Sequence, residues 1–282
     1  MKIVKTIEEV RKCIMEWRRE GLSIGFIPTM GYLHEGHQSL INQADENDRI
    51  VLSIFVNPMQ FGPQEDLASY PRDLERDSRL CEENGVDLIF HPEPEEMYEA
   101  DFCSYADMSV LTEELCGLSR PVHFRGVCTV VLKLFNIVTP DRAYFGEKDA
   151  QQLAIIKRMV RDLNINVEVI GCPIIRERDG VAKSSRNTYL NAEERKAAPV
   201  LYGSIQIGKK LIKDGERDAA VLIKVMKKYI EKEPLAKIDY LKAVDAMSMS
   251  QVDKLDRRVL VAMAVFIGKS RLIDNFTFDF EE

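Results

Sequence analysis

Residues 22–45 of the chain read LSIGFIPTMGYLHEGHQSLINQAD, and this stretch decides our fold prediction. The apolar run Leu22–Pro28 (LSIGFIP) has the length of a buried strand and is followed directly by turn residues. A helix is predicted after the turn, through about Asp45. Residues Pro28–His37 (PTMGYLHEGH) would therefore join the carboxyl end of a strand to the amino end of a helix.

The same order of strand and helix recurs through the first part of the chain. This alternation predicts an α/β fold, a Rossmann-like parallel sheet with helices on both faces. In open sheets of this kind, ligands bind beyond the carboxyl ends of the strands. The run Val127–Val138 is apolar nearly all round, so it is either a buried helix or a strand. The other predicted strands are Arg49–Val56, Asp87–Phe90, Arg142–Gly146 and Asn166–Ile170, and the predicted helices are Asp73–Asn84 and Gln151–Leu163, with Asp149 as a possible cap.

The pattern changes after about Arg176, where a polar loop (RERDGVAKSSRNTYLN) begins. Asn191 and Glu194 have the spacing of a capping box and predict the start of a helix. We predict two domains, a nucleotide-binding domain over residues 1–176 and a smaller C-terminal α+β domain over residues 177–282. The elements predicted in the second domain are a helix over Arg217–Glu231 and strands over Ile238–Val244, Arg258–Ile267 and Leu272–Phe278.

Composition and charge exclude several classes of protein. The chain has 39 Lys and Arg against 46 Asp and Glu, a net charge of −7, and no basic stripe of the kind that binds nucleic acid. No apolar run approaches the ~20 residues of a membrane helix, and the N-terminus lacks a secretory signal. The six cysteines form no CxxC pair and have no zinc-site spacing. We therefore expect a cytoplasmic protein that binds neither membrane nor nucleic acid.

The most informative cluster is the HxGH sequence formed by His34, Gly36 and His37. A helix N-terminus offers unpaired backbone N–H groups and a partial positive charge, so it attracts phosphate. Two imidazoles three residues apart could add donors to a phosphoryl group, where charge grows during nucleotidyl transfer. Alternatively, the histidines are a helix cap and a surface residue. A metal site is a third option, but the sequence places no further ligand nearby.

Two further clusters carry cations in predicted loops. Gly146–Gln152 (GEKDAQQ) lies at another junction of strand and helix, and its Lys148 could bridge phosphates. The alternative is a solvated helix start with Asp149 as its cap. Lys183–Asn187 (KSSRN) offers two hydroxyl groups and a guanidinium that suit the β- and γ-phosphates of ATP, although it could be an ordinary polar loop.

A fourth cluster, Phe55–Phe61 (FVNPMQF), places two amides among apolar residues at the end of a predicted strand. Buried amides need hydrogen-bond partners. Asn57 and Gln60 therefore either pair with the backbone or bind a small polar substrate.

Together these motifs resemble the pantothenate synthetase (pantoate–β-alanine ligase) family, within the nucleotidyltransferase superfamily that carries HIGH-type motifs. PTMGYLHEGH, FVNPMQF with the downstream YPRDLERD, HFRGVCTVV, YFGEKDAQQ and KSSRN occur in the order and at the separations of the family. The resemblance covers essentially the whole chain. It departs from the family pattern at Tyr32, often Ala, at Ala150, often aromatic, and at Lys183, frequently Met.

The resemblance implies an enzyme that uses ATP and Mg²⁺ to adenylate pantoate and then joins it to β-alanine, releasing AMP and pyrophosphate. His37 would donate a proton to the leaving group, and the other catalytic residues would be His34, Lys148 and Arg186. Pantoate would be bound by Gln60 and Gln152, with Asn57 as a third substrate-binding residue. The residues implied to contact ATP are Met30, Gly31, Tyr32, Leu33, His34, Glu35, Gly36, His37, Gly146, Glu147, Lys148, Asp149, Ile175, Lys183, Ser184, Ser185 and Arg186.

The resemblance also implies that the smaller domain closes over the ATP site, that Mg²⁺ bridges ATP phosphates without a protein metal site, and that the chain forms a homodimer. Two other functions stay open from the residues alone. A nucleotidyltransferase of the superfamily could keep the nucleotide on its product. A non-catalytic nucleotide-binding protein could retain the same fold.

Overall fold

The computed structural model describes residues 1–63 and 65–280 and divides the chain into two compact units. Unit 1 consists of Met1–Met108, Arg120–Glu147 and Ile155–Pro173. Unit 2 consists of Ser109–Ser119, Lys148–Ala154 and the chain from Ile174 onward. Two short segments that precede Ile174 thus belong to unit 2.

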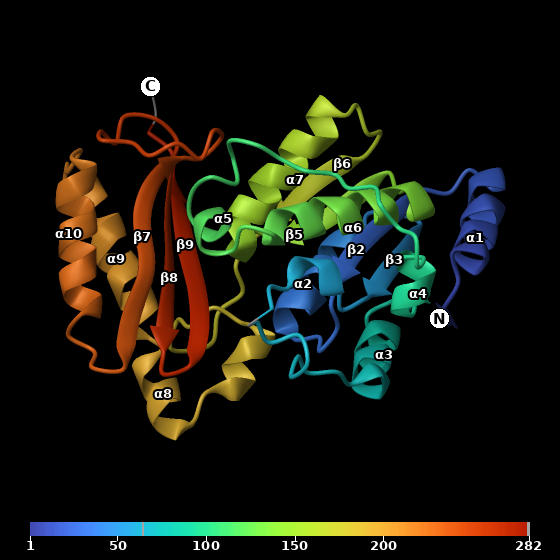
Figure 1. The fold of residues 1–282 in the computed structure, drawn as a ribbon, viewed down its shortest axis with the longest axis horizontal. Coiled ribbons are helices and arrows are strands. Elements are labelled where there is room, and N and C mark those ends of the chain that lie inside the picture. Colours follow the sequence, from blue (N-terminus) through green and yellow to red (C-terminus); the bar gives the residue numbers. More distant parts are fainter. Residues whose placement is uncertain (64, 281–282) are drawn as a thin grey trace. The chain divides into compact units, whose positions relative to one another are not determined.

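Unit 1 is built on a six-stranded sheet in the order β1-β4-β3-β2-β5-β6, and every pair of neighbours is parallel (Figure 1). The predicted alternation is confirmed, and the edge strand β1 is added to it. The central strand β2 is almost wholly buried because helices cover both faces of the sheet. The bounds are β1 (Lys2–Val4), β2 (Ile24–Thr29), β3 (Arg49–Ile54), β4 (Leu88–Phe90), β5 (Arg142–Gly146) and β6 (Glu168–Cys172).

Two pairs of helices cover this sheet. Helices α2 (Glu35–Ala44) and α3 (Leu74–Glu83) contribute to a core with Ile27, Leu52 and Ile89. Helix α1 (Ile7–Arg19) contacts α6, which also packs on β2.

Helix α6 (His123–Val138) resolves the ambiguous apolar run of the sequence. It has 16 residues and buries most of them, because it packs against β2, α1 and a short helix after β3. The helix ends at Thr139, which adopts a left-handed conformation with φ 44°. Two short helices precede α6 in the chain, α4 (Pro94–Met97) and α5 (Cys116–Ser119). Helix α7 (Ala150–Asp162) starts directly after Asp149.

Unit 2 contains an antiparallel sheet in the order β7-β8-β9, with α9 and α10 on one face (Figure 1). Side chains of both helices and of all three strands form its core. The predicted fold class, a parallel sheet with helices and a smaller α+β part, is confirmed, as is the capping box of Asn191 and Glu194. The bounds are α8 (Ala192–Ala197), α9 (Val200–Lys213), α10 (Ala219–Ile230), β7 (Ala236–Asp245), β8 (Val259–Ile267) and β9 (Ser270–Phe278).

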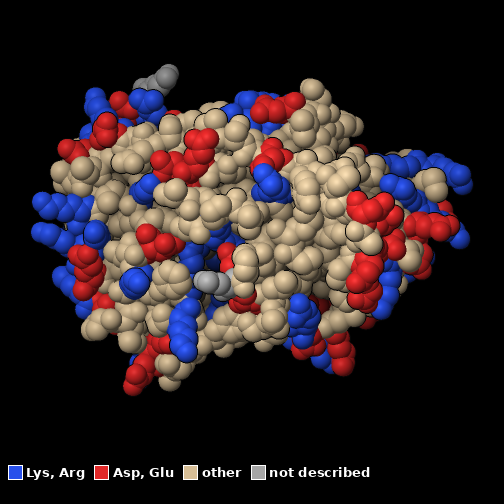
Figure 2. Space-filling view, viewed as in Figure 1, with Lys and Arg blue, Asp and Glu red and all other residues tan. Residues whose placement is uncertain are grey.

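The surface carries both signs of charge. On the face in Figure 2, Lys and Arg side chains are interspersed with Asp and Glu. All six cysteines lie among the described residues and are free thiols. No helix in the described ranges is long and apolar enough to cross a membrane.

The packing of α10 yields a prediction about stability. Leu222 is fully buried (0% exposed) in the core of unit 2, whereas its neighbour Val221 is 41% exposed. We expect Leu222→Ala to destabilise the protein by about 2–5 kcal/mol, because it removes buried methyl groups and leaves a cavity. Val221→Ala on the same helix is the matched control and should change stability by less than about 0.5 kcal/mol. Denaturant unfolding measures both variants, and equal losses would contradict the assignment of this core.

Candidate active site

Three neighbouring strands of unit 1 end in the motifs that the sequence singled out. Strand β2 leads into the HxGH sequence, β3 into FVNPMQF, and β5 into GEKDAQQ. Since these strands are parallel neighbours, the residues that follow them start from the same edge of the sheet. This edge is where a ligand is expected in an open α/β sheet.

The two histidines cap helix α2 reciprocally. His34 is the N-cap residue, and its Nδ1 accepts a hydrogen bond from the backbone N–H of Gly36 at 3.0 Å. His37 Nδ1 accepts from the backbone N–H of His34 at 3.2 Å. The ring centroids lie 4.2 Å apart. In the usual capping box the N-cap residue is Ser or Thr and the N3 residue is Glu or Gln. Here both positions are histidine, His34 and His37.

This capping selects the tautomer of both rings. An imidazole nitrogen that accepts a hydrogen bond carries no hydrogen, so the proton of each neutral ring is on Nε2. His34 and His37, in the first turn of α2, therefore carry their ring N–H on Nε2 when neutral. The cap predicted as an alternative is present, and it is compatible with a phosphate site because the Nε2 donors are not used in capping.

The loop before His34 is held by helix α3. Gly31 and Tyr32 adopt left-handed conformations with φ 82° and 52°. Asp77, which is 1% exposed, accepts backbone hydrogen bonds at 2.7 Å from Tyr32 and from Leu33, one on each carboxylate oxygen. Burial raises the pKa of the Asp77 carboxyl, and the hydrogen bonds from Leu33 and Tyr32 offset part of that rise.

The amides of FVNPMQF are held together on the short helix η1 (Pro58–Gln60). Asn57 is 1% exposed and donates to Gln60 Oε1 and to the carbonyl of Gly126, both at 3.1 Å. Its Oδ1 accepts from the Tyr98 hydroxyl at 2.8 Å. Asn57 therefore fixes the orientation of Gln60, which donates from Nε2 to Met30 Sδ at 3.2 Å. This contact joins the first and fourth clusters within unit 1.

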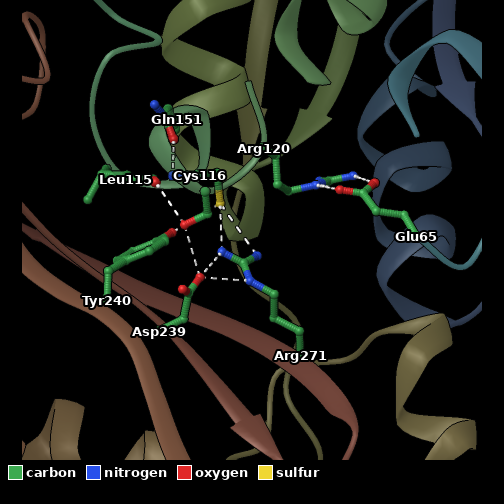
Figure 3. A network of polar contacts seen from close by, with 9 residues as sticks. Glu65, Leu115, Cys116, Arg120, Gln151, Asp239, Tyr240 and Arg271 are labelled. Atoms are coloured by element: carbon green, nitrogen blue, oxygen red, sulfur yellow. Dashed lines mark hydrogen bonds and ion pairs between the residues drawn. The ribbon is translucent and has the colours of Figure 1, made fainter. Parts of the chain in front are cut away.

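Helix α6 and Arg120 hold η1 in place. His123 Nδ1 lies 3.0 Å from the carbonyl oxygen of Gln60, and Arg120 forms two hydrogen bonds of 2.7 and 2.6 Å with Glu65 (Figure 3). Burial favours a raised pKa for Glu65, but the hydrogen bond and charge of Arg120 outweigh it and hold that pKa below its ordinary value. At Gly126, an added Cβ would collide with the carbonyl oxygen of Met59.

Unit 2 contains the rest of the GEKDAQQ cluster from Lys148 onward. The carbonyl of Lys148 accepts a hydrogen bond at 2.9 Å from Asn275 of β9. The buried Gln151 donates to the carbonyls of Leu111 and Glu114, both at 2.8 Å, and accepts from the backbone N–H of Cys116 at 2.9 Å.

The segment Ser109–Ser119 of unit 2 is also tied to strands β7 and β9. Figure 3 shows Cys116 facing Tyr240 and Arg271, with Sγ 3.1 Å from the Tyr240 hydroxyl and 3.7 Å from both terminal nitrogens of Arg271. Arg271 also bonds to Asp239 at 2.8 Å. Together with the bonds of Gln151, these contacts fix the segment next to the first turn of α7.

The remaining predicted ATP contacts of unit 2 lie on a hairpin and the turn that follows it. The backbone N–H of Lys183 donates to the carbonyl of Ile175 at 2.9 Å. Arg176 forms bonds of 2.7 and 2.9 Å with Asp274, which is 2% exposed, and so anchors the hairpin to β9. Ser184 caps the short helix η3 (Ser185–Tyr189) by accepting from the backbone N–H of Arg186 at 3.3 Å.

The sequence thus placed the predicted residues at the ends of elements, and the structure distributes them over the two units. Unit 1 holds Met30 to His37, Asn57, Gln60, Gly146 and Glu147, and unit 2 holds Lys148, Asp149, Gln152, Ile175 and Lys183 to Arg186.

Sequence reasoning missed the polar residues that hold these segments, namely Asp77, Gln151, Asp274 and Asn275. Each of the four is at most 6% exposed and pairs with backbone or with an arginine. Signals existed for all four: Asp77 ends the motif YPRDLERD, Gln151 lies in GEKDAQQ, and Asp274 and Asn275 are adjacent polar residues inside the strand sequence RLIDNFTF.

Comparison with known proteins decides the family. The family model described as pantoate-beta-alanine ligase matches residues 2–277. The chain belongs to the pantoate-beta-alanine ligase family. A relative named pantothenate synthetase from Ruminiclostridium cellulolyticum is 68% identical over 278 residues, 99% of each chain.

Solved structures agree with this membership. The crystal structure of the pantothenate synthetase from Thermus thermophilus superposes with a TM-score of 0.93 at 45% identity, covering 98% of this chain and 99% of that one. The ligase from Francisella tularensis, complexed with β,γ-ATP and β-alanine, gives 0.80 at 35% identity, covering 98% and 97%. As a member of the pantoate-beta-alanine ligase family, the chain is an enzyme that joins pantoate to β-alanine.

The close contact of α6 with η1 predicts a defect in this ligase. Gly126→Ala forces the backbone of Met59 to move and should displace Gln60, because the obstructing atoms are main chain. If Gln60 binds pantoate, as the resemblance implies, we expect the KM for pantoate to rise about tenfold, since small displacements of binding groups have large effects.

Gly62→Ala is the matched control, because Gly62 lies just after η1 and its added Cβ would meet only the Glu65 side chain, at 3.7 Å. Steady-state kinetics with pantoate varied measures both variants. An unchanged pantoate KM in Gly126→Ala would show that Gln60 does not bind this substrate.

Proposed function

We propose that the enzyme works through a pantoyl adenylate. The pantoate carboxylate attacks the α-phosphate of ATP and displaces pyrophosphate. The amine of β-alanine then attacks the activated carbonyl and displaces AMP, giving pantothenate. A carboxylate is a poor acyl donor at neutral pH, so adenylation is needed to supply a leaving group.

The observation that carries this proposal is the reciprocal capping of α2 by His34 and His37. Both Nε2–H groups are donors beside a helix N-terminus, where phosphate is favoured. Such donors stabilise the charge that develops on the α-phosphate and on pyrophosphate without reorganising in the reaction. In this proposal His37 donates a proton to the leaving pyrophosphate, and Met30 to Gly36 line the ATP site in a Rossmann-like binding mode.

Gln60 and Gln152 bind the hydroxyl and carboxylate groups of pantoate in this scheme. Gln60 is suited to this role because its carbonyl accepts from Asn57, which leaves its amide group as the donor. The acceptor of that donor is now Met30 Sδ, a weak acceptor that a substrate oxygen could replace. Asn57 is fully engaged with protein groups, so we assign it the orientation of Gln60.

In the same scheme, further residues after β5 and on the turn around η3 contact ATP. Lys148 and Arg186 contact the phosphates, Lys183, Ser184 and Ser185 complete the loop around them, and Gly146, Glu147, Asp149 and Ile175 contact ribose and adenine. The hydrogen bond from Asn275 to the carbonyl of Lys148 supports the role of Lys148 at the phosphates, because it fixes the backbone of that residue. We propose that residues 177–282 act as the domain that closes over bound ATP.

Mg²⁺ fits this scheme as an ion carried by ATP. In residues 1–63 and 65–280, no three His, Cys, Asp or Glu side chains are grouped so that they could hold a metal. Mg²⁺ retains several waters and binds substrate phosphates readily, so phosphate oxygens suit it as main ligands. When bound it would neutralise charge on the phosphates. We further propose that the enzyme is a cytoplasmic homodimer, which light scattering after size exclusion tests.

The products distinguish this function from the alternatives. With ATP and Mg²⁺, we expect AMP to form only when both pantoate and β-alanine are present, because the second acid releases AMP from the adenylate. Chromatographic quantification of AMP measures this. AMP that requires neither acid would rule out the ligase mechanism. A nucleotide retained on the product would favour a nucleotidyltransferase, and ATP binding without pyrophosphate release would favour a non-catalytic protein.

Two substitutions test the assigned donors. His37→Ala and Lys148→Ala should each slow adenylate formation by roughly 10²–10³-fold, the cost of one donor to a transition-state charge. Pantoate-dependent exchange of labelled pyrophosphate into ATP measures this step. His91→Ala and the exposed Lys157→Ala are the matched controls and should retain exchange. Near-normal exchange in His37→Ala or Lys148→Ala would remove that residue from the mechanism.

A further inference from the structure

Helix α3 contains no residue assigned to ATP or pantoate, yet two of its side chains form hydrogen bonds with the loop that leads into the HxGH sequence. The left-handed conformation of Tyr32 is unfavourable for a residue with a side chain and persists only when its surroundings hold it. The holding groups come from two neighbouring residues of α3, Arg76 and Asp77.

Asp77 controls the backbone of the loop. Its Oδ2 accepts from Tyr32 N–H and its Oδ1 from Leu33 N–H, both at 2.7 Å, so both carboxylate oxygens are engaged. The adjacent Gly31 leaves no room for a side chain, since an added Cβ would lie 3.1 Å from Asp77 Oδ2 and 2.9 Å from Ile54 Cγ2.

Arg76 completes the clamp on the same loop. Its Nη2 donates to the carbonyl of Leu33 at 3.1 Å, and its guanidinium lies 4.9 Å from the centroid of the Tyr32 ring. On the other side, the N–H of Gly31 donates at 3.1 Å to Thr29 Oγ1, which itself donates to the carbonyl of Ser53 at 2.7 Å. The residue after Leu33 is His34, the N-cap of α2.

We propose that Asp77 is a positioning residue for adenylation, which acts through the backbone of Tyr32 and Leu33 to place the imidazoles of His34 and His37. This inference rests on the proposed role of those histidines at the phosphates of ATP. Asp77 itself touches neither substrate in this scheme. Its carboxylate makes the loop rigid before ATP binds, so the donors need no rearrangement in the reaction.

Asp77→Asn tests the inference with little change in size. The amide has a single oxygen acceptor, so its NH₂ group would face one of the two backbone N–H donors at close range. We expect pantoate-dependent pyrophosphate exchange to fall about tenfold to a hundredfold, as expected when hydrogen bonds to a charged group are lost. Amide formation from supplied pantoyl adenylate and β-alanine should change less than about twofold, since it transfers no pyrophosphate.

Asp73→Asn is the matched control. Asp73 is the N-cap of the same helix and accepts from the backbone N–H of Arg76 at 3.1 Å. Because Asn caps helices about as well as Asp, this variant should keep both half-reactions. Arg76→Ala, which leaves Asp77 in place, supplies a second test should Asp77→Asn fail to fold, and it should lower exchange more than amide formation.

The outcomes separate this inference from the proposed function. If the unaltered enzyme shows no pantoate-dependent exchange, the proposed mechanism fails and the role of Asp77 fails with it. If the unaltered enzyme is active and folded Asp77→Asn exchanges normally, or loses both half-reactions equally, the positioning role alone is overturned. If Asp77→Asn does not fold, Arg76→Ala decides. An equal loss of exchange and of amide formation in Arg76→Ala would also overturn the positioning role.

Discussion

The parallel pairing of β2 with β3 and β5 is the constraint on which the site of unit 1 depends. Parallel neighbours end at one edge of the sheet, so the chain leaves Thr29, Ile54 and Gly146 toward the same side. The register cannot slip easily, because β2 is buried on both faces and a shift would misplace its packed side chains. The buried sheet therefore fixes the points from which the HxGH loop, the segment of η1 and GEKDAQQ leave it.

Beyond the strand ends, buried polar side chains replace regular secondary structure as the source of order. Asp77 holds the loop before α2, and Asn57 bonds to Gly126 and so sets η1. Gln151 holds the segment Ser109–Ser119, and Asn275 holds the carbonyl of Lys148. A buried polar group is costly unless it is paired, so each of these groups strongly favours a single conformation of the segment that it bonds. Such segments can present donors to a ligand without further ordering, which is the property that electrostatic catalysis requires.

The histidines illustrate how one arrangement serves both fold and chemistry. Capping uses Nδ1 of His34 and His37 and so stabilises the first turn of α2. The same hydrogen bonds leave the proton of each neutral ring on Nε2, where it can be donated. The choice that the sequence left open between a helix cap and a phosphate donor is therefore not exclusive, because the two roles use different nitrogens.

The sequence by itself determined the order of the elements, their approximate ends, the capping box at Asn191 and the motifs of the site, because periodicity and capping involve residues close together in the chain. It did not decide between helix and strand for α6, whose residues are apolar on nearly every side and are sorted only by packing. It also did not identify Asp77 or Asn275 as supports. Asp77 binds a residue 45 positions away and Asn275 one 127 positions away. Only the tertiary structure brings such groups together, since burial and strand topology choose their partners.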